Sequence, residues 1–277
     1  MDSEKLLIIG CGDLGRRLAQ FSAERSVAIT GMRRRIQNAP ACATIRYVRG
    51  DYTRLTDLKA VISEGYERVL LCPTPSERSD HGYRQGYVQL CQNLVRAYDD
   101  LPAPKRVILV SSTSVYGQTD GSWVNETSLT QPQRFSGQRL LEAEEVLRHS
   151  GLPVVVARPA GLYGPGRERL ITRVLDGAVR ASGAFTNRMH IDDAARALDH
   201  LLYEVPEPAA IYLLSDGQAP TQGEVVHWLA GQLGAPEPTT EEPDSLNKRV
   251  DNRRLLATGF EFIYRSFQAG FTTVIQR

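Results

Sequence analysis

Three glycines near the start of the chain have the spacing of a phosphate-binding loop. Residues 10–15 read GCGDLG, so that Gly10, Gly12 and Gly15 follow an apolar run and precede a helical stretch. Glycines at this spacing permit a tight turn, close approach of the backbone to a pyrophosphate and close packing of a helix on a strand. We therefore expect the loop, with Asp13 and Leu14 inside it, to bind a dinucleotide rather than to form a purely structural turn.

A basic cluster ends the second apolar run and bears on the type of cofactor. An NAD site usually carries an acid about 20 residues beyond the glycines, whereas an arginine there suits the 2′-phosphate of NADP. Residues 32–35 read MRRR with no acid, which favours NADP while leaving NAD possible, with Arg33 on the phosphate and Arg34 and Arg35 solvated. Asp51 follows the third run and either lies near the adenine amino group or belongs to a simple turn.

Phe135 and Arg139 are four residues apart in the helical stretch QPQRFSGQRLLEAEEVL (131–147), so they share one helix face. That face belongs either to the core or to a reaction site. A phenyl ring has no proton to exchange. A guanidinium donates hydrogen bonds but keeps its charge, so it takes no part in a proton relay.

Other reactive residue types lack the spacing that a site would need. The five histidines show no HxxxH or HExxH pattern and the four cysteines no CxxC pair, so we predict no metal site and reduced thiols. Ser111 and Ser112 lack the GxSxG elbow of a hydrolase. Arg167, Arg169 and Arg173 either line a pocket for an anionic substrate or form a solvated face.

Strand and helix signals alternate along the chain and predict how these residues are positioned. Apolar runs occur at 5–10, 26–30, 44–48, 68–72, 106–112, 153–159 and 210–215, and helical periodicity at 83–100, 137–149, 168–181, 191–204 and 222–234. Most runs are continuously apolar, as in strands covered on both faces. The alternation predicts an α/β fold with a doubly wound parallel sheet (Rossmann) and a small discontinuous C-terminal cap.

Domain organisation and composition narrow the function further. We expect residues 1–160 to form the dinucleotide-binding domain and 161–277 mainly a substrate-binding cap, with 187–215 returning to the Rossmann core. Hydrophobic residues make up 42% and the net charge is +1, so neither nucleic acid nor an anionic membrane is indicated as a partner. No apolar run approaches the roughly 20 residues of a membrane span, and we expect a cytoplasmic protein.

Five motifs in order resemble the extended short-chain dehydrogenase/reductase group, the relatives of the NAD-dependent epimerases and dehydratases. They are GCGDLG (10–15), SSTSVYG (111–117), the helix that begins near 135, ARPAGLYGPG (157–166) and NRMHIDDAARAL (187–198). The resemblance covers nearly the whole chain, and the atypical YeeZ-like proteins are its nearest members.

The resemblance implies roles for particular residues. Ser112 falls on the position of the hydroxyl that orients the substrate, with Ser111 beside the cofactor. The catalytic Tyr-x-x-x-Lys of the group falls on Phe135-x-x-x-Arg139, so Arg139 would hold the nicotinamide ribose while the proton-exchanging phenol is missing. Tyr163, His190 or water would then have to move the proton, unless His190 simply forms hydrogen bonds near a helix cap.

These roles lead to two functional hypotheses. The first is an NADP-dependent oxidoreductase or epimerase-like enzyme that uses nicotinamide hydride transfer on a small polar substrate, such as a sugar nucleotide or another anionic compound. The second is a catalytically silent NADP-binding sensor or regulatory protein. Members of the group often dimerise through the helix that carries Phe135, so we expect a homodimer.

Overall fold

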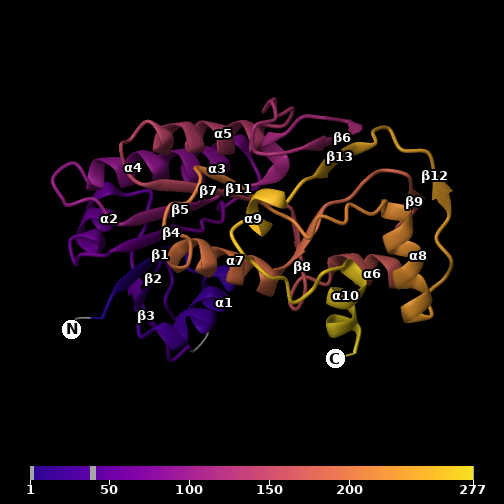
Figure 1. The fold of residues 1–277 in the computed structure, drawn as a ribbon, viewed down its shortest axis with the longest axis horizontal. Helices are drawn as coiled ribbons and strands as arrows, with labels where there is room; N and C mark the ends of the chain where they lie inside the picture. The colour runs from indigo at the N-terminus through magenta and orange to yellow at the C-terminus, as the bar shows by residue number, and fades with distance from the viewer. Residues whose placement is uncertain (1–2, 38–41, 277) are drawn as a thin grey trace. The chain divides into compact units, whose positions relative to one another are not determined.

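The structure is a computed structural model that describes residues 3–37 and 42–276. Its central sheet has seven parallel strands. Among these residues the sheet has the order β11-β7-β5-β4-β1-β2-β3 (Figure 1). Its strands are β1 (Lys5–Ile9), β2 (Ala28–Arg33), β3 (Ile45–Arg49), β4 (Arg68–Leu71), β5 (Arg106–Val110), β7 (Val154–Pro159) and β11 (Ile211–Leu214). Each overlaps one of the seven apolar runs, and the doubly wound parallel sheet is confirmed.

The strand order creates the place where a ligand binds in such sheets. From β1 the chain proceeds outward to β2 and β3, and then returns to pair β4 with the other side of β1. Loops that leave β1 and β4 therefore diverge at the carboxyl ends of these strands. Open α/β sheets bind their ligands at this switch point.

Helices cover both faces of the sheet, which explains why its strands are continuously apolar (Figure 1). On one face lie α1 (Asp13–Phe21) and α7 (Ile191–Tyr203), and on the other α2 (Leu55–Ile62), α4 (Leu90–Ala97) and α5 (Phe135–Arg148). Successive side chains of a strand point to opposite faces. In β1, Leu7 and Ile9 pack with the α2, α4 and α5 layer, while Leu6 and Ile8 point the other way, and all four are fully buried.

The helical stretch before α4 is not a regular α-helix. It begins as α3 (Asp80–Tyr83), continues as a π-helix, η2 (Arg84–Gln89), and becomes α4 at Leu90. The start lies three residues before the predicted one because the Ser79 hydroxyl accepts the N–H of Gly82 and caps the first turn. Two short 3₁₀ turns, η1 (Ser22–Arg25) and η3 (Thr113–Val115), follow α1 and β5.

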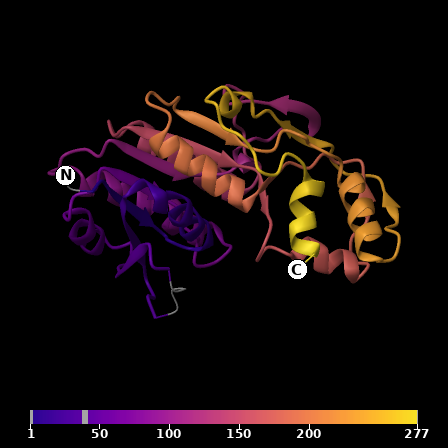
Figure 2. The ribbon, with the colours of Figure 1, turned by 60° about the horizontal axis from the view of Figure 1, so that its bottom comes forward.

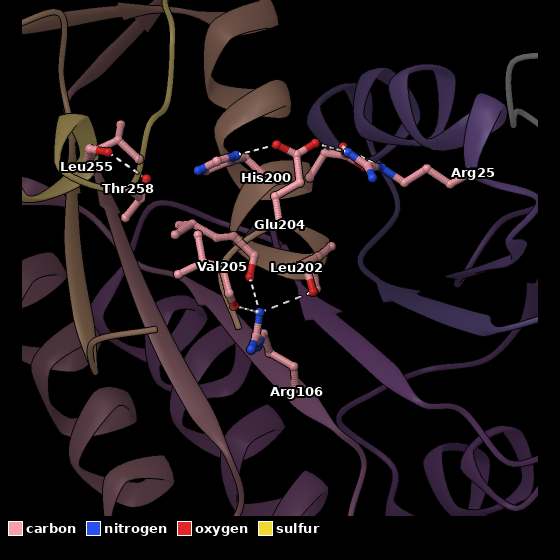
Figure 3. Close-up of polar contacts among 10 residues, drawn as sticks. Arg25, Arg106, His200, Leu202, Glu204, Val205, Leu255 and Thr258 are labelled. Atoms are coloured by element: carbon pink, nitrogen blue, oxygen red, sulfur yellow. Dashed lines mark hydrogen bonds and ion pairs between the residues drawn. The ribbon is translucent and has the colours of Figure 1, made fainter. Parts of the chain in front are cut away.

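Charged side chains hold the end of α7 (Figure 3). The buried guanidinium of Arg106 at the start of β5 donates to the carbonyl oxygens of Leu201 (2.6 Å), Leu202 (3.2 Å) and Val205 (2.8 Å). Carbonyl oxygens in the last turn of a helix have no intrahelical hydrogen-bond donor. The guanidinium supplies one, and its positive charge is favourable at the negative end of the helix dipole. Glu204, the residue after the helix, accepts a hydrogen bond from Arg25.

The chain divides into two compact units that are not contiguous in sequence. One comprises Met1–Val115, Pro132–Arg158 and Ala195–Ile211; the other comprises Tyr116–Gln131, Pro159–Ala194 and Tyr212–Arg277. The second contains three short parallel strand pairs: β6 (Asp120–Val124) with β13 (Asn247–Val250), β8 (Gly161–Tyr163) with β10 (Arg188–His190), and β9 (Ala181–Ser182) with β12 (Thr240–Glu241).

Helices α6 (Arg169–Leu175), α8 (Gln222–Leu233) and α10 (Phe267–Ile275) enclose a separate core in the second unit (Figure 2). Val174, Leu229 and Phe271 are buried in it. A capping box between Thr221 and Glu224 starts α8. The short helix α9 (Arg253–Leu256) lies between β13 and α10 in the sequence.

The predicted helix over 168–181 is wrong in its second half. The structure ends α6 at Leu175, and Gly177 adopts a left-handed φ of 63°, which stops the helix. Residues 181–182 instead form β9. Among the described residues, no helix has the length and apolar character needed to cross a membrane.

Candidate functional site

The three glycines of the loop after β1 each meet a different steric demand. Gly10 has φ 78°, and a Cβ there would lie 2.6 Å from the carbonyl oxygen of Cys72. A Cβ at Gly15 would lie 2.8 Å from Cγ2 of Ile8, so α1 packs directly on β1. A Cβ at Gly12 would meet only the carbonyl oxygen of Gly10, at 3.8 Å, so its outer side is open. Tight turn, close packing and free approach are the three functions that the spacing predicts.

A cavity of about 530 Å³ opens beside this loop, at the carboxyl ends of β1, β2 and β4. Its lining consists of Gly10, Cys11, Gly12, Met32, Arg33, Arg34, Arg35, Tyr52, Thr74 and Ser76. The lining contains three arginines and no acid. The open side of Gly12, the N-terminus of α1 and these arginines suit a dinucleotide that carries phosphate groups.

Two acids predicted near the cofactor have local partners. Asp13, the first residue of α1, forms ion pairs with Arg16 (3.2 Å) and Arg17 (3.0 Å). Asp51 accepts the N–H (3.0 Å) and the hydroxyl (2.7 Å) of Thr53, and lines a neighbouring hollow rather than the cavity of the glycine loop. Leu14 is buried in the core. The turn interpretation of Asp51 therefore accounts for its contacts.

The two serines at the end of β5 differ in their surroundings. Ser111 is 5% exposed, and its hydroxyl donates to Glu144, which forms a buried ion pair with Arg158. Ser112 is half-buried, and its Oγ accepts the N–H of Ser114 at 3.1 Å. The Ser111 hydroxyl is thus part of a buried hydrogen-bond network, whereas Ser112 is the more exposed of the two serines.

The first turn of α5 carries Phe135 and Arg139 as the sequence predicts, but with specific partners. The Phe135 ring is 38% exposed and lies edge-on to Tyr83, with ring centroids 5.6 Å apart. Arg139 donates from Nε (2.8 Å) and Nη2 (2.9 Å) to the two carboxylate oxygens of Asp80, and from Nη1 to Glu142 (2.6 Å). The hydrogen bonds that Arg139 donates to Asp80 raise the pKa of its guanidinium, so its charge is permanent.

Tyr163 and His190 come together in the second unit, with their rings edge-on at 5.4 Å. The Tyr163 hydroxyl donates to the carbonyl of Ser266 (3.3 Å), and burial raises the pKa of this phenol. His190 is 1% exposed, and its Nδ1 accepts the N–H of Asp192 (3.2 Å) at the start of α7. Burial makes Tyr163 a poor proton donor, and the contact of His190 is of the helix-capping kind.

The remaining candidate sites have surface or local explanations. Arg169 and Arg173 are exposed on α6, and Arg173 donates to the carbonyl of Ala178 (2.9 Å), in keeping with a solvated face. Within residues 3–37 and 42–276, no three His, Cys, Asp or Glu side chains are grouped to hold a metal.

Sequence reasoning missed Tyr83 and Asp80, which contact the two predicted residues of α5. The four-residue interval from Tyr83 to Tyr87 indicates a shared helix face, and their rings are indeed stacked at 5.6 Å. No local pattern reveals that this face meets Phe135, because the contact joins segments about fifty residues apart.

Comparison with known proteins places the chain among cofactor-binding relatives. A model of the NAD(P)H-binding family matches residues 10–198. Protein YeeZ of Escherichia coli K12 is 30% identical over 271 residues, which cover 94% of this chain and 96% of YeeZ.

Solved structures agree with this placement. A protein of Methylobacillus flagellatus classed with the NAD-dependent epimerases/dehydratases is 31% identical with a TM-score of 0.85, over 99% of this chain and 98% of its own. MoeE5 in complex with UDP-glucose and NAD is 25% identical with a TM-score of 0.82, over 98% and 97% of the two chains. The chain therefore belongs to the NAD(P)H-binding Rossmann family, as an epimerase/dehydratase-like homologue of YeeZ.

Proposed function

We propose that the protein is an NADP-dependent oxidoreductase or epimerase that acts on a small polar substrate. The observation that carries the proposal is the cavity of the glycine loop, in which arginines stand where an NAD site usually has an acid. Arg33 closes β2 and lines this cavity, so its guanidinium is the one best placed at a 2′-phosphate. The loop backbone and the N-terminus of α1 would hold the pyrophosphate.

The nicotinamide supplies a hydride donor or acceptor at its C4 atom when the cofactor is bound. Ser112 would orient the reacting oxygen of the substrate through its hydroxyl. Arg139 would donate hydrogen bonds to the nicotinamide ribose, and its guanidinium is oriented by the ion pair with Asp80. Because MoeE5 is solved with UDP-glucose, a UDP-sugar is the first substrate class to test.

Titration with NADPH and NADH tests the cofactor proposal. A charge-assisted hydrogen bond to the 2′-phosphate contributes about 1.5–3 kcal/mol, so NADPH should bind about 10- to 100-fold more tightly than NADH. Arg33→Ala should abolish this preference. Arg49→Ala is the matched control, because Arg49 is the register partner of Arg33 on β3 and does not line the cavity. Equal or tighter binding of NADH by the wild type would overturn the preference for NADP.

The second candidate function is an NADP-binding regulatory protein without catalysis, which Phe135 in place of a phenol favours. Incubation with NADP⁺ and UDP-sugars, followed by analysis of both cofactor and sugar, separates the two functions. Saturable binding of NADPH with no conversion of any UDP-sugar would favour the regulatory protein. Conversion that depends on Ser112 would favour the enzyme.

We also propose a cytoplasmic homodimer, with the α5 side chain Leu141 at the interface. Leu141 is half-buried in the isolated chain, whereas Val146, the other residue considered for the interface, packs against the core of the same chain. Light scattering on the purified protein should give twice the mass of one chain, and Leu141→Glu should reduce it to the mass of one.

A further inference from the structure

A cluster of three aromatic rings lies where the missing phenol would be expected. The Phe135 ring contacts Tyr83 edge-on, at an interplanar angle of 82°, and Tyr83 stacks on Tyr87 at 28°. Tyr83 ends α3, and the π-helical turn η2 follows it directly. Such π-turns are rare and occur often at functional sites. A phenol is therefore present one ring contact away from Phe135, on a different helix.

Contacts on both sides fix the position of Tyr83 relative to α5. Asp80, one turn before Tyr83, receives two hydrogen bonds from Arg139, one turn after Phe135. A bidentate pair of this kind sets orientation as well as distance. The first turn of α3 and the first turn of α5 are thus connected twice, by the ion pair of Asp80 with Arg139 and by the ring contact of Tyr83 with Phe135.

Tight packing also joins α5 to the segment that carries Ser112. A Cβ at Gly137 would lie 2.4 Å from the carbonyl oxygen of Ser114, so the first turn of α5 lies directly on the residues after β5. Tyr83 follows β4 and Ser112 follows β5, two neighbouring parallel strands. Both segments therefore begin at the same carboxyl edge of the sheet, and the first turn of α5 contacts each of them, through Phe135 on Tyr83 and through Gly137 on Ser114.

Two other tyrosines near this edge have backbone carbonyls as hydrogen-bond acceptors. The Tyr87 hydroxyl donates to the carbonyl of Pro73 (3.4 Å), and burial raises its pKa. Tyr52 donates to the carbonyl of Thr74 (3.3 Å), and burial raises its pKa as well. Tyr83 is half-buried, and its ring is held by aromatic contacts on two sides.

We propose that Tyr83 is the catalytic acid and base that replaces the phenol absent from position 135. This inference rests on the proposed function. In the reducing direction, the C=O π bond of the substrate breaks as hydride forms the new C–H bond. The O–H bond of Tyr83 breaks and its proton forms the new O–H bond on the substrate. The phenolate then regains a proton from water, so that NADPH, ketone and one proton give NADP⁺ and alcohol.

Ionisation of Tyr83 tests the proposal without a known substrate. The phenolate absorbs in the near ultraviolet, so titrations of wild type and Tyr83→Phe, with and without NADP⁺, isolate this one group. If the positive nicotinamide ring lies beside Tyr83, NADP⁺ should increase the phenolate absorbance of the wild type at a fixed alkaline pH, and the Tyr83→Phe variant should lack this increase. Tyr87→Phe is the matched control, because it removes the hydroxyl of the stacked neighbour, keeps its ring and should leave the NADP⁺-dependent change intact.

Transfer of the phenol back to α5 provides a second readout. Tyr83→Phe should slow conversion of an active UDP-sugar about 100-fold or more at unchanged KM, since general acid–base catalysis contributes a factor of this size. Adding Phe135→Tyr to that variant should restore a large part of the rate. Phenylalanine at position 83 keeps the ring contacts, so Tyr83→Phe should fold. If Tyr83→Phe is nevertheless unstable, fluorotyrosine at position 83 reports the ionisation of this hydroxyl by fluorine NMR.

The outcomes separate the two proposals. Absence of saturable NADP⁺ binding by the wild type overturns the proposed function and this inference with it. Binding of NADP⁺ without any change in the ionisation of Tyr83 overturns the inference alone. A Tyr83→Phe variant that keeps its full rate also overturns it.

Discussion

Replacing Glu144 with Gln should destabilise the protein strongly, because Glu144 is half of a buried ion pair. Glu144 and Arg158 are 1% and 3% exposed. Arg158 donates from Nε (3.1 Å) and Nη2 (2.5 Å) to the carboxylate, and Ser111 donates to it as well. Glu144→Gln preserves the shape but turns an amide NH₂ or a neutral oxygen toward a buried cation. Breaking one partner of such a pair costs about 3–5 kcal/mol.

Thermal unfolding measures this cost directly. At about 2–4 °C per kcal/mol for a protein of this size class, Tm should fall by about 6–20 °C. Glu145→Gln is the control: the neighbouring carboxylate is exposed on the same helix, and its loss should change stability by less than about 0.5 kcal/mol. Replacing both Glu144 and Arg158 with Met should recover most of the loss, because a buried pair can be exchanged for apolar side chains at little cost. If Glu144→Gln melts within about 2 °C of Glu145→Gln, the pair does not carry the stability assigned to it here.

Three further predictions concern the loop, a buried acid and the end of α7. Gly12→Ala should fold normally yet lose at least about 10-fold in NADPH affinity, measured by calorimetry, because its Cβ would project into open space at the cavity. Gly10→Ala should instead lower the free energy of unfolding in urea by about 2 kcal/mol or more, because the φ of this residue is positive and its Cβ would collide with a backbone carbonyl. Burial raises the pKa of Asp216 to about 6, so between about pH 4 and 6 the folded protein keeps a proton that the unfolded chain releases, and stability falls as pH rises through this range. In urea unfolding, Asp216→Asn should therefore be more stable than the wild type by up to about 3 kcal/mol at pH 7 and equal to it below pH 4. Arg106→Met should cost about 3 kcal/mol or more in the same assay, because the buried carbonyls at the end of α7 lose their donor, and a loss under about 1 kcal/mol would mean that water replaces it.

The order of strands and helices was predictable because local pattern determines it. Runs such as RVLLC and PVVVARP are mainly apolar without alternating polar residues, which is the pattern of strands covered on both faces. Helix ends were less predictable, since they depend on single residues: Ser79 extends a helix by three residues, and Gly177 ends α6 early. The π-turn η2 leaves no signature in the residue types that compose it.

The glycine loop was predictable for the same local reason, whereas the partners of the other site residues were not. Spacing alone places Gly10, Gly12 and Gly15. The pairing of Arg139 with Asp80 joins residues 59 positions apart, and that of Ser111 with Glu144 joins residues 33 positions apart. Such contacts arise only once the sheet has brought distant segments to one edge, so no periodicity in the sequence reports them.

The interleaving of the two units also determines when each can be completed during synthesis. Domains that are continuous in sequence can fold as they leave the ribosome, amino-terminal part first. The unit that contains the glycine loop here needs Pro132–Arg158 and Ala195–Ile211, so residue 211 of 277 must be available before it is whole. The newly made first 115 residues would expose the apolar faces that α5 and the second half of α7 later cover. This chain should therefore depend on chaperones during translation more than a Rossmann domain encoded in one piece.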